Sequence, residues 1–122
     1  TATAGASLGG LISFMLAWEY PEIFSKAACI SPAFKIESID YVSQVKKYSG
    51  VKKQIKFYFV SGGIGLEKKL QSGIDEMIST LNEKGYEVNE DFIWKLFIED
   101  EHSEMYWAKR FYLPLKFFFG MN

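Results

Sequence analysis

The chain has 122 residues, which at roughly 150 residues per domain allows one compact unit and no second domain. Hydrophobic residues make up 48% and charged residues 24%, which is ordinary for a folded globular protein and argues against disorder. The 14 basic and 15 acidic side chains leave no basic excess for a nucleic-acid partner, no apolar stretch approaches the ~20 residues of a membrane helix, and one cysteine cannot form an internal disulfide.

The first half of the chain alternates between strand and helix signals. Small and β-branched residues at positions 1–4 predict the end of a strand. A helical stripe follows, and it ends at Tyr20 because a residue before proline avoids the helical region. The stripe consists of Leu8, Leu11, Ile12, Met15 and Leu16. The apolar run at 27–30 predicts a buried strand, and residues 38–48 predict a short helix that ends before Gly50.

The second half continues this alternation. Strand-forming residues occupy 55–60, and apolar residues at helical spacing over 70–81 predict a long helix that Gly85 caps. Residues 92–98 predict another strand, and a last helix follows that Pro114 should kink or restart. The order β-α-β-α-β-α-β-α predicts an α/β fold with a mainly parallel sheet of about four strands, flanked by helices.

The segment Gly5-Ala6-Ser7-Leu8-Gly9 matches the G-x-S-x-G motif of a nucleophile elbow. In that motif the serine sits on a strained turn between a strand and a helix, so we expect a positive φ at Ser7. Residues two before and two after the serine crowd the same space, which predicts that Gly5 and Gly9 must lack side chains. The backbone N–H of Leu8, at the helix N-terminus, becomes one donor for an oxyanion. The alternative is a plain glycine-rich turn, but the flanking strand and helix signals favour the elbow.

His102 is the only histidine in the chain, and it follows the last predicted strand. A serine hydroxyl needs a neighbouring base to act as a nucleophile at neutral pH, so His102 is the candidate base for Ser7. Open α/β sheets place their sites at the carboxyl ends of strands, which is where His102 is expected to lie. The alternative is a surface histidine in an acidic loop.

The third member of a catalytic triad would be a carboxylate that orients the imidazole of His102. Glu67 follows the strand at 55–60 through a glycine-containing loop, and the chain order serine, acid, histidine is that of α/β-hydrolases. The alternative is that Glu67 only stabilises the start of the next helix, by about 0.3–1 kcal/mol. The other carboxylates considered are weaker candidates: Asp75, Asp40, Asp100 and Glu101.

Signals for a cofactor are absent from the sequence. No cluster of cysteine and histidine is present to bind zinc, and the loop at 62–65 lacks the lysine and the following serine or threonine of a phosphate-binding loop. We therefore expect neither a metal nor a cofactor. The aromatic residues after Phe92 are expected to form core, and Trp107, about one helical turn beyond His102, is a weaker candidate for lining a pocket.

Three segments are together similar to the putative esterase family of α/β-hydrolases. They are the elbow with its helix at 5–14, the sequence Tyr20-Pro21-Glu22-Ile23-Phe24, and the sequence Ile30-Ser31-Pro32-Ala33-Phe34. That family includes esterase D-like enzymes, enterochelin esterases and feruloyl esterase modules. The resemblance covers essentially the whole chain and implies an α/β-hydrolase fold.

The resemblance also implies an activity. It implies a serine esterase that cleaves carboxylic esters through an acyl-enzyme, with Ser7 as nucleophile, His102 as base and Glu67 as acid, and with no cofactor. It implies a small-molecule ester substrate, such as a siderophore lactone or a carbohydrate-linked acyl ester. The family also contains acyltransferases, so transfer of the acyl group to an alcohol other than water stays open.

Members of the family carry strands before the elbow, and an early loop there supplies the second oxyanion donor. We therefore expect residues 1–122 to be the C-terminal part of a single hydrolase domain, from the elbow to the closing helix, without its N-terminal half. The first strand would then have an open edge, which is a template for association with another chain. The alternative to an enzyme is a hydrolase-like fragment with a binding or structural role.

Overall fold

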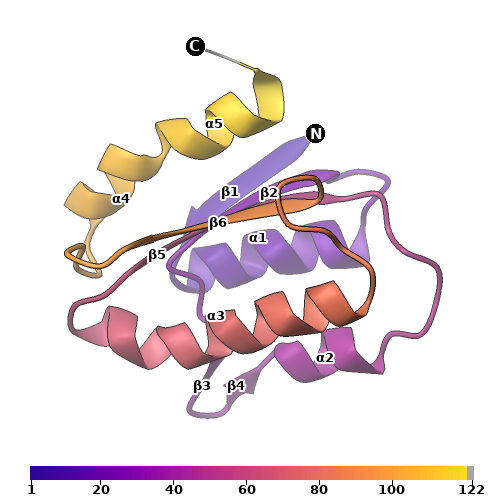
Figure 1. Ribbon diagram of the computed structural model, residues 1–122, viewed down its shortest axis with the longest axis horizontal. Helices are drawn as coiled ribbons and strands as arrows, with labels where there is room; N and C mark the ends of the chain where they lie inside the picture. Colours follow the sequence, from indigo (N-terminus) through magenta and orange to yellow (C-terminus); the bar gives the residue numbers. More distant parts are fainter. Residues whose placement is uncertain (121–122) are drawn as a thin grey trace.

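The computed structural model describes residues 1–120, and Figure 1 shows its elements. Four parallel strands form the main sheet, in the order β1 (Ala2–Ala6), β2 (Lys26–Ile30), β5 (Lys56–Gly62) and β6 (Phe92–Phe97). The strands β3 (Lys35–Ile36) and β4 (Ile39–Asp40) form a separate antiparallel hairpin. The helices are α1 (Leu8–Glu19), α2 (Val42–Lys47), α3 (Leu66–Glu83), α4 (Glu104–Arg110) and α5 (Tyr112–Phe119). The predicted α/β fold with a parallel, four-stranded sheet is confirmed.

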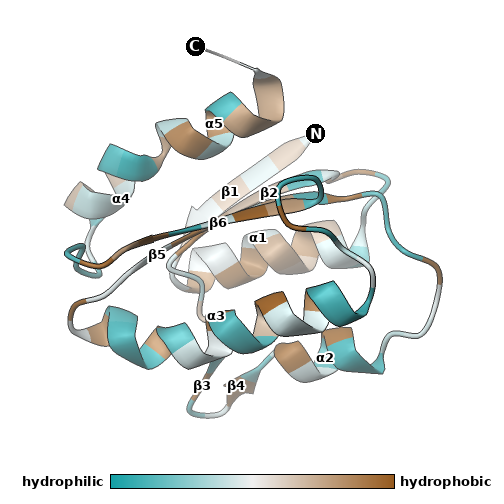
Figure 2. Cartoon of the chain, viewed as in Figure 1, coloured by the Kyte–Doolittle hydropathy of each residue, from teal (hydrophilic) through white to brown (hydrophobic). Residues whose placement is uncertain are grey.

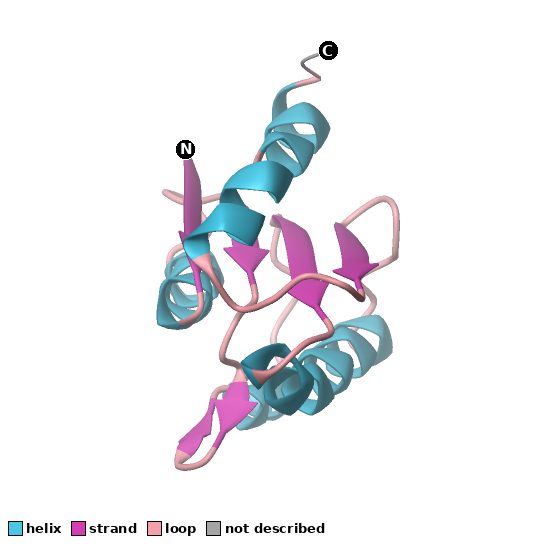
Figure 3. Ribbon diagram, turned by 90° about the vertical axis from the view of Figure 1, so that its left-hand side faces the viewer, coloured by secondary structure: helices cyan, strands magenta, loops and turns pink. Residues whose placement is uncertain are grey.

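Helices cover both faces of the sheet. In Figure 1, α1, α2 and α3 lie on one side of the strands and α4 and α5 lie on the other, and the turned view of Figure 3 shows the row of strands between these layers. Parallel strands need crossover connections of this kind, because each strand must begin at the same end of the sheet. The strands β1 and β6 form the two edges. Among residues 1–120, no helix has the length and apolar character that crossing a membrane requires.

The side chains of β5 pack against the helices on both faces of the sheet, because successive residues of a strand point to opposite faces. Phe57 and Phe59 belong to the larger core on the α1 and α3 side, where the ring of Phe14 lies 4.6 and 6.2 Å from their ring centroids. Tyr58 and Val60 belong to a smaller core with side chains of α4 and α5. A strand that is buried on both faces is apolar throughout, whereas α3 in Figure 2 shows hydrophilic patches between hydrophobic ones, as a helix with one exposed face does.

The segment between β2 and α2 differs from its prediction. The sequence predicts a helix over 38–48, but residues 39 and 40 form β4 and the helix begins only at Val42. The Asp40 carboxylate accepts hydrogen bonds from the backbone N–H of Ser43 at 3.1 Å and from its hydroxyl at 2.7 Å. These bonds satisfy a donor in the first turn of α2, so the helix starts after Asp40 rather than before it.

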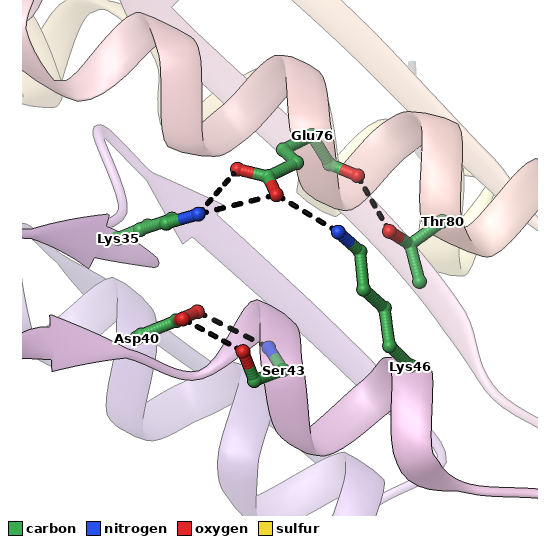
Figure 4. Close-up of polar contacts among 6 residues, drawn as sticks. All are labelled: Lys35, Asp40, Ser43, Lys46, Glu76 and Thr80. Atoms are coloured by element: carbon green, nitrogen blue, oxygen red, sulfur yellow. Dashed lines mark hydrogen bonds and ion pairs between the residues drawn. The ribbon is translucent and has the colours of Figure 1, made fainter.

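A polar cluster joins this hairpin to the helices beside it, and Figure 4 shows its members. Lys35 of β3 and Lys46 of α2 donate to the Glu76 carboxylate of α3, at 3.0 and 2.9 Å. The hydrogen bonds from Lys46 and Lys35 lower the pKa of Glu76. Because these side chains are exposed, the cluster fastens the hairpin only weakly compared with the core beneath it.

Two helix boundaries, the end of α3 and the start of α5, follow the sequence signals. Gly85 has a φ of 93°, and its N–H donates to the carbonyl of Asn82 while Tyr86 donates to Leu81, which is the glycine-terminated pattern expected at the end of α3. Pro114 is the third residue of α5, where no intrahelical partner exists for a backbone N–H. The predicted restart of the final helix near Pro114 is confirmed.

Candidate active site

Ser7 occupies the turn between β1 and α1, and its backbone conformation is strained. Its φ of 58° and ψ of −121° lie in a region that costs a non-glycine residue on the order of 1–3 kcal/mol. The strain is held by hydrogen bonds: the Ser7 N–H donates to the carbonyl of Ile30 at 2.9 Å, and the Ser7 carbonyl accepts from Gly10 and Ala33 at 3.0 and 3.2 Å. The prediction of a positive φ at Ser7 is confirmed.

The glycines around Ser7 have different reasons to be there. A Cβ on Gly5 would overlap the backbone carbonyl of Gly9, and a Cβ on Gly10 would lie 3.0 Å from the carbonyl oxygen of Ile30. A Cβ on Gly9, however, would meet no atom within 4 Å. The prediction that Gly9 must lack a side chain is therefore wrong for contacts within this chain. Of the two motif glycines, only Gly5 is needed for close packing, because its Cβ would meet the Gly9 backbone whereas a Cβ on Gly9 would meet open space.

Three residues that follow three different strands meet at the carboxyl end of the sheet. His102 follows β6, and its Nε2 lies 3.0 Å from the Oγ of Ser7. Its Nδ1 lies 2.6 Å from Oε2 of Glu67, the second residue of α3. An ionised carboxylate only accepts, so Nδ1–H donates to Glu67 and Nε2 is left to accept the Ser7 hydroxyl proton. The three predicted site residues are thus brought into one hydrogen-bonded chain.

The Glu67 carboxylate is buried, with only 2% of its side chain exposed. Its Oε1 accepts the backbone N–H of Gly62 at 2.8 Å and the hydroxyl of Ser31 at 2.5 Å. With Oε2 against His102, both oxygens have partners, which is what a buried charge requires. No motif in the sequence singles out Ser31 as a member of this group. The signal that could have found it is its place directly after β2, since polar residues at strand ends meet at one edge of a parallel sheet.

The loop that carries His102 is fastened by the residue two positions before it. The carbonyl of Asp100 accepts the N–H groups of Gly63 and Ile64, at 3.1 and 3.2 Å, and so joins the loop after β6 to the loop after β5. Its carboxylate binds Arg110 of α4 through two hydrogen bonds of 2.8 Å, and this bond raises the pKa of Arg110. Asp100 is therefore a structural residue rather than an acid for His102.

The other candidate acids lie away from the imidazole. Asp40 caps α2, as described above, and Asp75 accepts the side-chain amide of Gln71 at 2.8 Å. Glu101 faces the hydroxyl of Tyr106, at 3.4 Å. Of the carboxylates of residues 1–120, Glu67 is the one that the structure places against the imidazole.

Trp107 of α4 packs against the imidazole of His102. The two rings meet edge to face, with 4.9 Å between centroids and 86° between planes. A cavity of about 350 Å³ lies beside His102 and is bordered by Ile64, Leu66 and Met105. A second, largely apolar cavity of about 250 Å³ lies along β1 and is bordered by Trp107. Trp107 thus borders this second cavity and not the one beside His102.

The structure also bears on the oxyanion donor and on metals. Leu8 is the first residue of α1, so its N–H has no acceptor within the helix and lies at the positive end of the helix dipole.

Within the described part of the chain, no group of three histidine, cysteine, aspartate or glutamate side chains is arranged to hold a metal ion. Burial raises the pKa of the Cys29 thiol, which leaves that side chain inert.

The comparisons with known proteins that find a match all find an esterase or a serine hydrolase. A family described as "Putative esterase" matches residues 1–112, whereas a search of curated proteins finds no match. Among solved structures, the ferric enterobactin esterase of Salmonella typhimurium superposes with a TM-score of 0.80 at 15% identity, covering 98% of this chain and 30% of that one.

Two further structures are similar. A ferulic acid esterase has a TM-score of 0.74 at 17% identity over 93% of this chain and 49% of its own length. The fluorophosphonate-binding serine hydrolase F of Staphylococcus aureus has a TM-score of 0.63 at 16% identity, over 98% and 53%. The chain thus spans about a third to a half of the length of these structures, and at such identities the likeness concerns the fold.

Proposed function

We propose that this chain, which belongs to the putative esterase family, carries the nucleophile, base and acid of a serine hydrolase that cleaves carboxylic esters. The observation that carries the proposal is the unbroken contact chain from the Ser7 hydroxyl through His102 to Glu67, starting at a strained turn. A structural serine needs neither the strain nor the histidine, and a structural histidine needs no buried carboxylate. The combination is the one that activates a hydroxyl for attack.

In the proposed reaction, Nε2 of His102 takes the Ser7 proton as Oγ forms a bond to the ester carbonyl carbon. The carbonyl oxygen becomes an oxyanion, which the N–H of Leu8 stabilises. Collapse of this intermediate breaks the bond to the alcohol oxygen, and the alcohol leaves with the proton from Nε2. Water then attacks the acyl-enzyme by the same route and frees the acid. Glu67 holds the imidazole in orientation and stabilises its charged form throughout.

We also propose that residues 1–122 form the part of a hydrolase domain that runs from the elbow to the closing helix. This proposal rests on the share of the similar structures that the chain covers. The second oxyanion donor would then come from outside these residues, and the lack of one donor costs about 10²–10³ in rate. The open edge of β1 would be the place where further strands, or a second copy, add to the sheet.

Labelling with a fluorophosphonate probe tests the proposed function, because the probe phosphonylates an activated serine whatever the natural ester is. We expect one label, which peptide mass spectrometry locates on Ser7, and we expect Ser7→Ala and His102→Ala to abolish it. The matched control is Ser49→Ala, which removes an exposed serine far from the site and should leave labelling unchanged. A folded chain that takes no label on Ser7, both alone and within the longer parent protein, would refute the enzyme and favour a binding or structural role.

Product analysis then separates the esterase from an acyltransferase. The labelled serine is the same in both cases, but the acyl group ends on different acceptors. With a small aryl ester as the substrate, we expect the free acid to be the product in water. An acyl ester formed preferentially with an added alcohol would replace hydrolysis by acyl transfer and leave the roles of Ser7, His102 and Glu67 unchanged.

A further inference from the structure

We propose that Ser31 is a positioning residue for the base, a role that rests on the proposed function and that acts through Glu67 and Trp107. Ser31 belongs to neither the elbow nor the loops that carry His102 and Glu67. It follows β2, and its side chain is 2% exposed. The chain therefore keeps a hydroxyl buried at the centre of the site, where an apolar side chain would avoid the cost of burying a polar group.

The orientation of this hydroxyl follows from its two partners. The indole N–H of Trp107 can only donate, and it reaches the Ser31 Oγ at 3.2 Å. The Ser31 hydroxyl must therefore accept from Trp107, and its single proton is free to point at Oε1 of Glu67, 2.5 Å away. A hydroxyl between a pure donor and a pure acceptor has only one arrangement that satisfies all three groups.

This arrangement limits the rotation of the Glu67 carboxylate. Oε1 is held by the hydroxyl of Ser31 and by the N–H of Gly62, so Oε2 is the oxygen left to face Nδ1 of His102. If the Ser31 bond is lost, one neutral donor remains on Oε1 and the carboxylate can turn about its side-chain bonds. The imidazole would then lose its fixed partner, and its Nε2 would no longer be held toward the serine.

Ser31 also holds Trp107, a second side chain that packs against the imidazole. The rings of Trp107 and His102 meet edge to face, and the indole N–H of Trp107 donates to the Ser31 hydroxyl. One hydroxyl thus fixes both the carboxylate on one side of the ring and the indole on another. These contacts join residues 36 and 76 positions apart, so they bring the ends of β2, β5 and β6 together.

The backbone of Ser31 is built for this position. Its φ is 47°, a conformation that costs energy for any residue but glycine, and its N–H donates to the carbonyl of Val60 at 2.6 Å. Glycine would be the easier residue for this backbone. The presence of serine indicates that the hydroxyl, rather than the backbone shape, is what the position requires.

Because of this backbone conformation, Ser31→Ala and Ser31→Gly together separate the effect of the hydroxyl from the effect of backbone strain. Both remove the hydroxyl, but alanine keeps the backbone strain and glycine relieves it. We expect both to slow fluorophosphonate labelling of Ser7 by roughly ten- to a hundredfold, in proportion to the misplacement of the base. We expect Ser31→Gly to unfold at a urea concentration no lower than Ser31→Ala does, so loss of rate in the glycine variant is not loss of fold.

A spectroscopic measurement follows the network without any turnover. Because His102 is the only histidine, the ring N–H signal that it gives in a proton NMR spectrum belongs to a single residue. We expect a low-field signal for Nδ1–H in the unchanged chain, and its broadening by exchange with water in both Ser31 variants. We expect Trp107→Phe, which removes the indole N–H and shortens the ring system but keeps an aromatic side chain at this position, to broaden it less.

The outcomes are distinct from those for the proposed function. If Ser7 takes a label neither in this chain alone nor within the longer parent protein, the proposed function fails, while the NMR signal still reports whether Ser31 orders the imidazole. The positioning role is overturned if Ser31→Gly and Ser31→Ala keep the labelling rate within about twofold, or if the His102 signal stays equally sharp in both. Ser49→Ala again serves as the control that should change neither measurement.

Discussion

A substitution of Gly5 by alanine tests the packing of the elbow directly, with Gly9→Ala as its matched control. Each glycine is two positions from Ser7 in the sequence, and neither has a positive φ, so an alanine is compatible with both backbone conformations. A Cβ on Gly5 would lie 2.5 Å from the carbonyl carbon of Gly9 and 3.0 Å from its Cα. Carbon atoms in favourable contact are about 3.5–4.0 Å apart, so the overlap is about 1 Å.

The magnitude follows from which atoms would have to move. The neighbours of the new methyl group are backbone atoms in the first turn of α1, and these cannot give way by changing a rotamer. We therefore expect Gly5→Ala to lower the free energy of unfolding by about 3 kcal/mol, the upper end of the usual cost of overpacking. Gly9→Ala meets no atom within 4 Å and lies in a helix, so it should raise that free energy by up to about 1 kcal/mol.

Urea denaturation followed by far-ultraviolet circular dichroism measures the difference. With a denaturant dependence of about 2 kcal/mol per molar, a difference of about 4 kcal/mol separates the two midpoints by about 2 M. Midpoints within about 0.5 M of each other would refute the one-sided crowding. Lower stability in Gly9→Ala than in Gly5→Ala would instead restore the original motif argument, in which both glycines must lack side chains.

Three further predictions concern stability and reactivity away from the elbow. Arg110→Ala leaves the buried Asp100 carboxylate without its partner, so it should lower the free energy of unfolding by about 3 kcal/mol. The control Lys109→Ala removes an exposed side chain and should change that free energy by less than about 0.5 kcal/mol. Equal losses of unfolding free energy in urea denaturation would contradict the role of the Asp100–Arg110 pair. The hydrogen bonds from Lys46 and Lys35 lower the pKa of Glu76, so this carboxylate stabilises the fold above the pKa of an unfolded glutamate and stops doing so as the pH falls. Glu76→Gln should therefore weaken the loss of stability with falling pH, measured by urea denaturation at several acidic pH values. If the loss of stability with falling pH is the same in Glu76→Gln, the pKa of Glu76 does not contribute to it. Burial raises the pKa of the Cys29 thiol, so a disulfide reagent at about pH 8 should modify it only on unfolding, and modification of the folded chain at the rate of a free thiol would contradict its burial.

The general fold could be predicted because its signals are local. The apolar residues of the first helix repeat at helical spacing, and residues 57–60 of the strand predicted at 55–60 are apolar without interruption, as expected where a strand is buried on both faces. Alternation of such elements permits few arrangements other than a parallel sheet between helices. The β3–β4 hairpin was not predicted because each of its strands has two residues, which is too short for any periodicity to appear.

The candidate site was predictable to the extent that its residues are rare or lie in a motif. Ser7 lies in a five-residue pattern whose backbone strain the structure reproduces, and His102 has no competitor in the chain. Glu67 was one of several carboxylates, and chain order favoured it only because order reflects which strand end a residue follows. The distances that join it to His102 belong to the structure alone.

What the sequence by itself determined is therefore the set of elements, their order and the chemical groups at the strand ends. What only the tertiary structure decided is which of those groups touch. Gly9 proved free of the crowding that its motif position predicts, because the neighbouring space depends on how strand and helix diverge. Ser31 proved to join Glu67 to Trp107, because its partners lie 36 and 76 residues away and meet it only when three strands align. Contacts over such separations leave no periodic trace in the chain, since they follow from the register of the sheet and not from the spacing of residues along it.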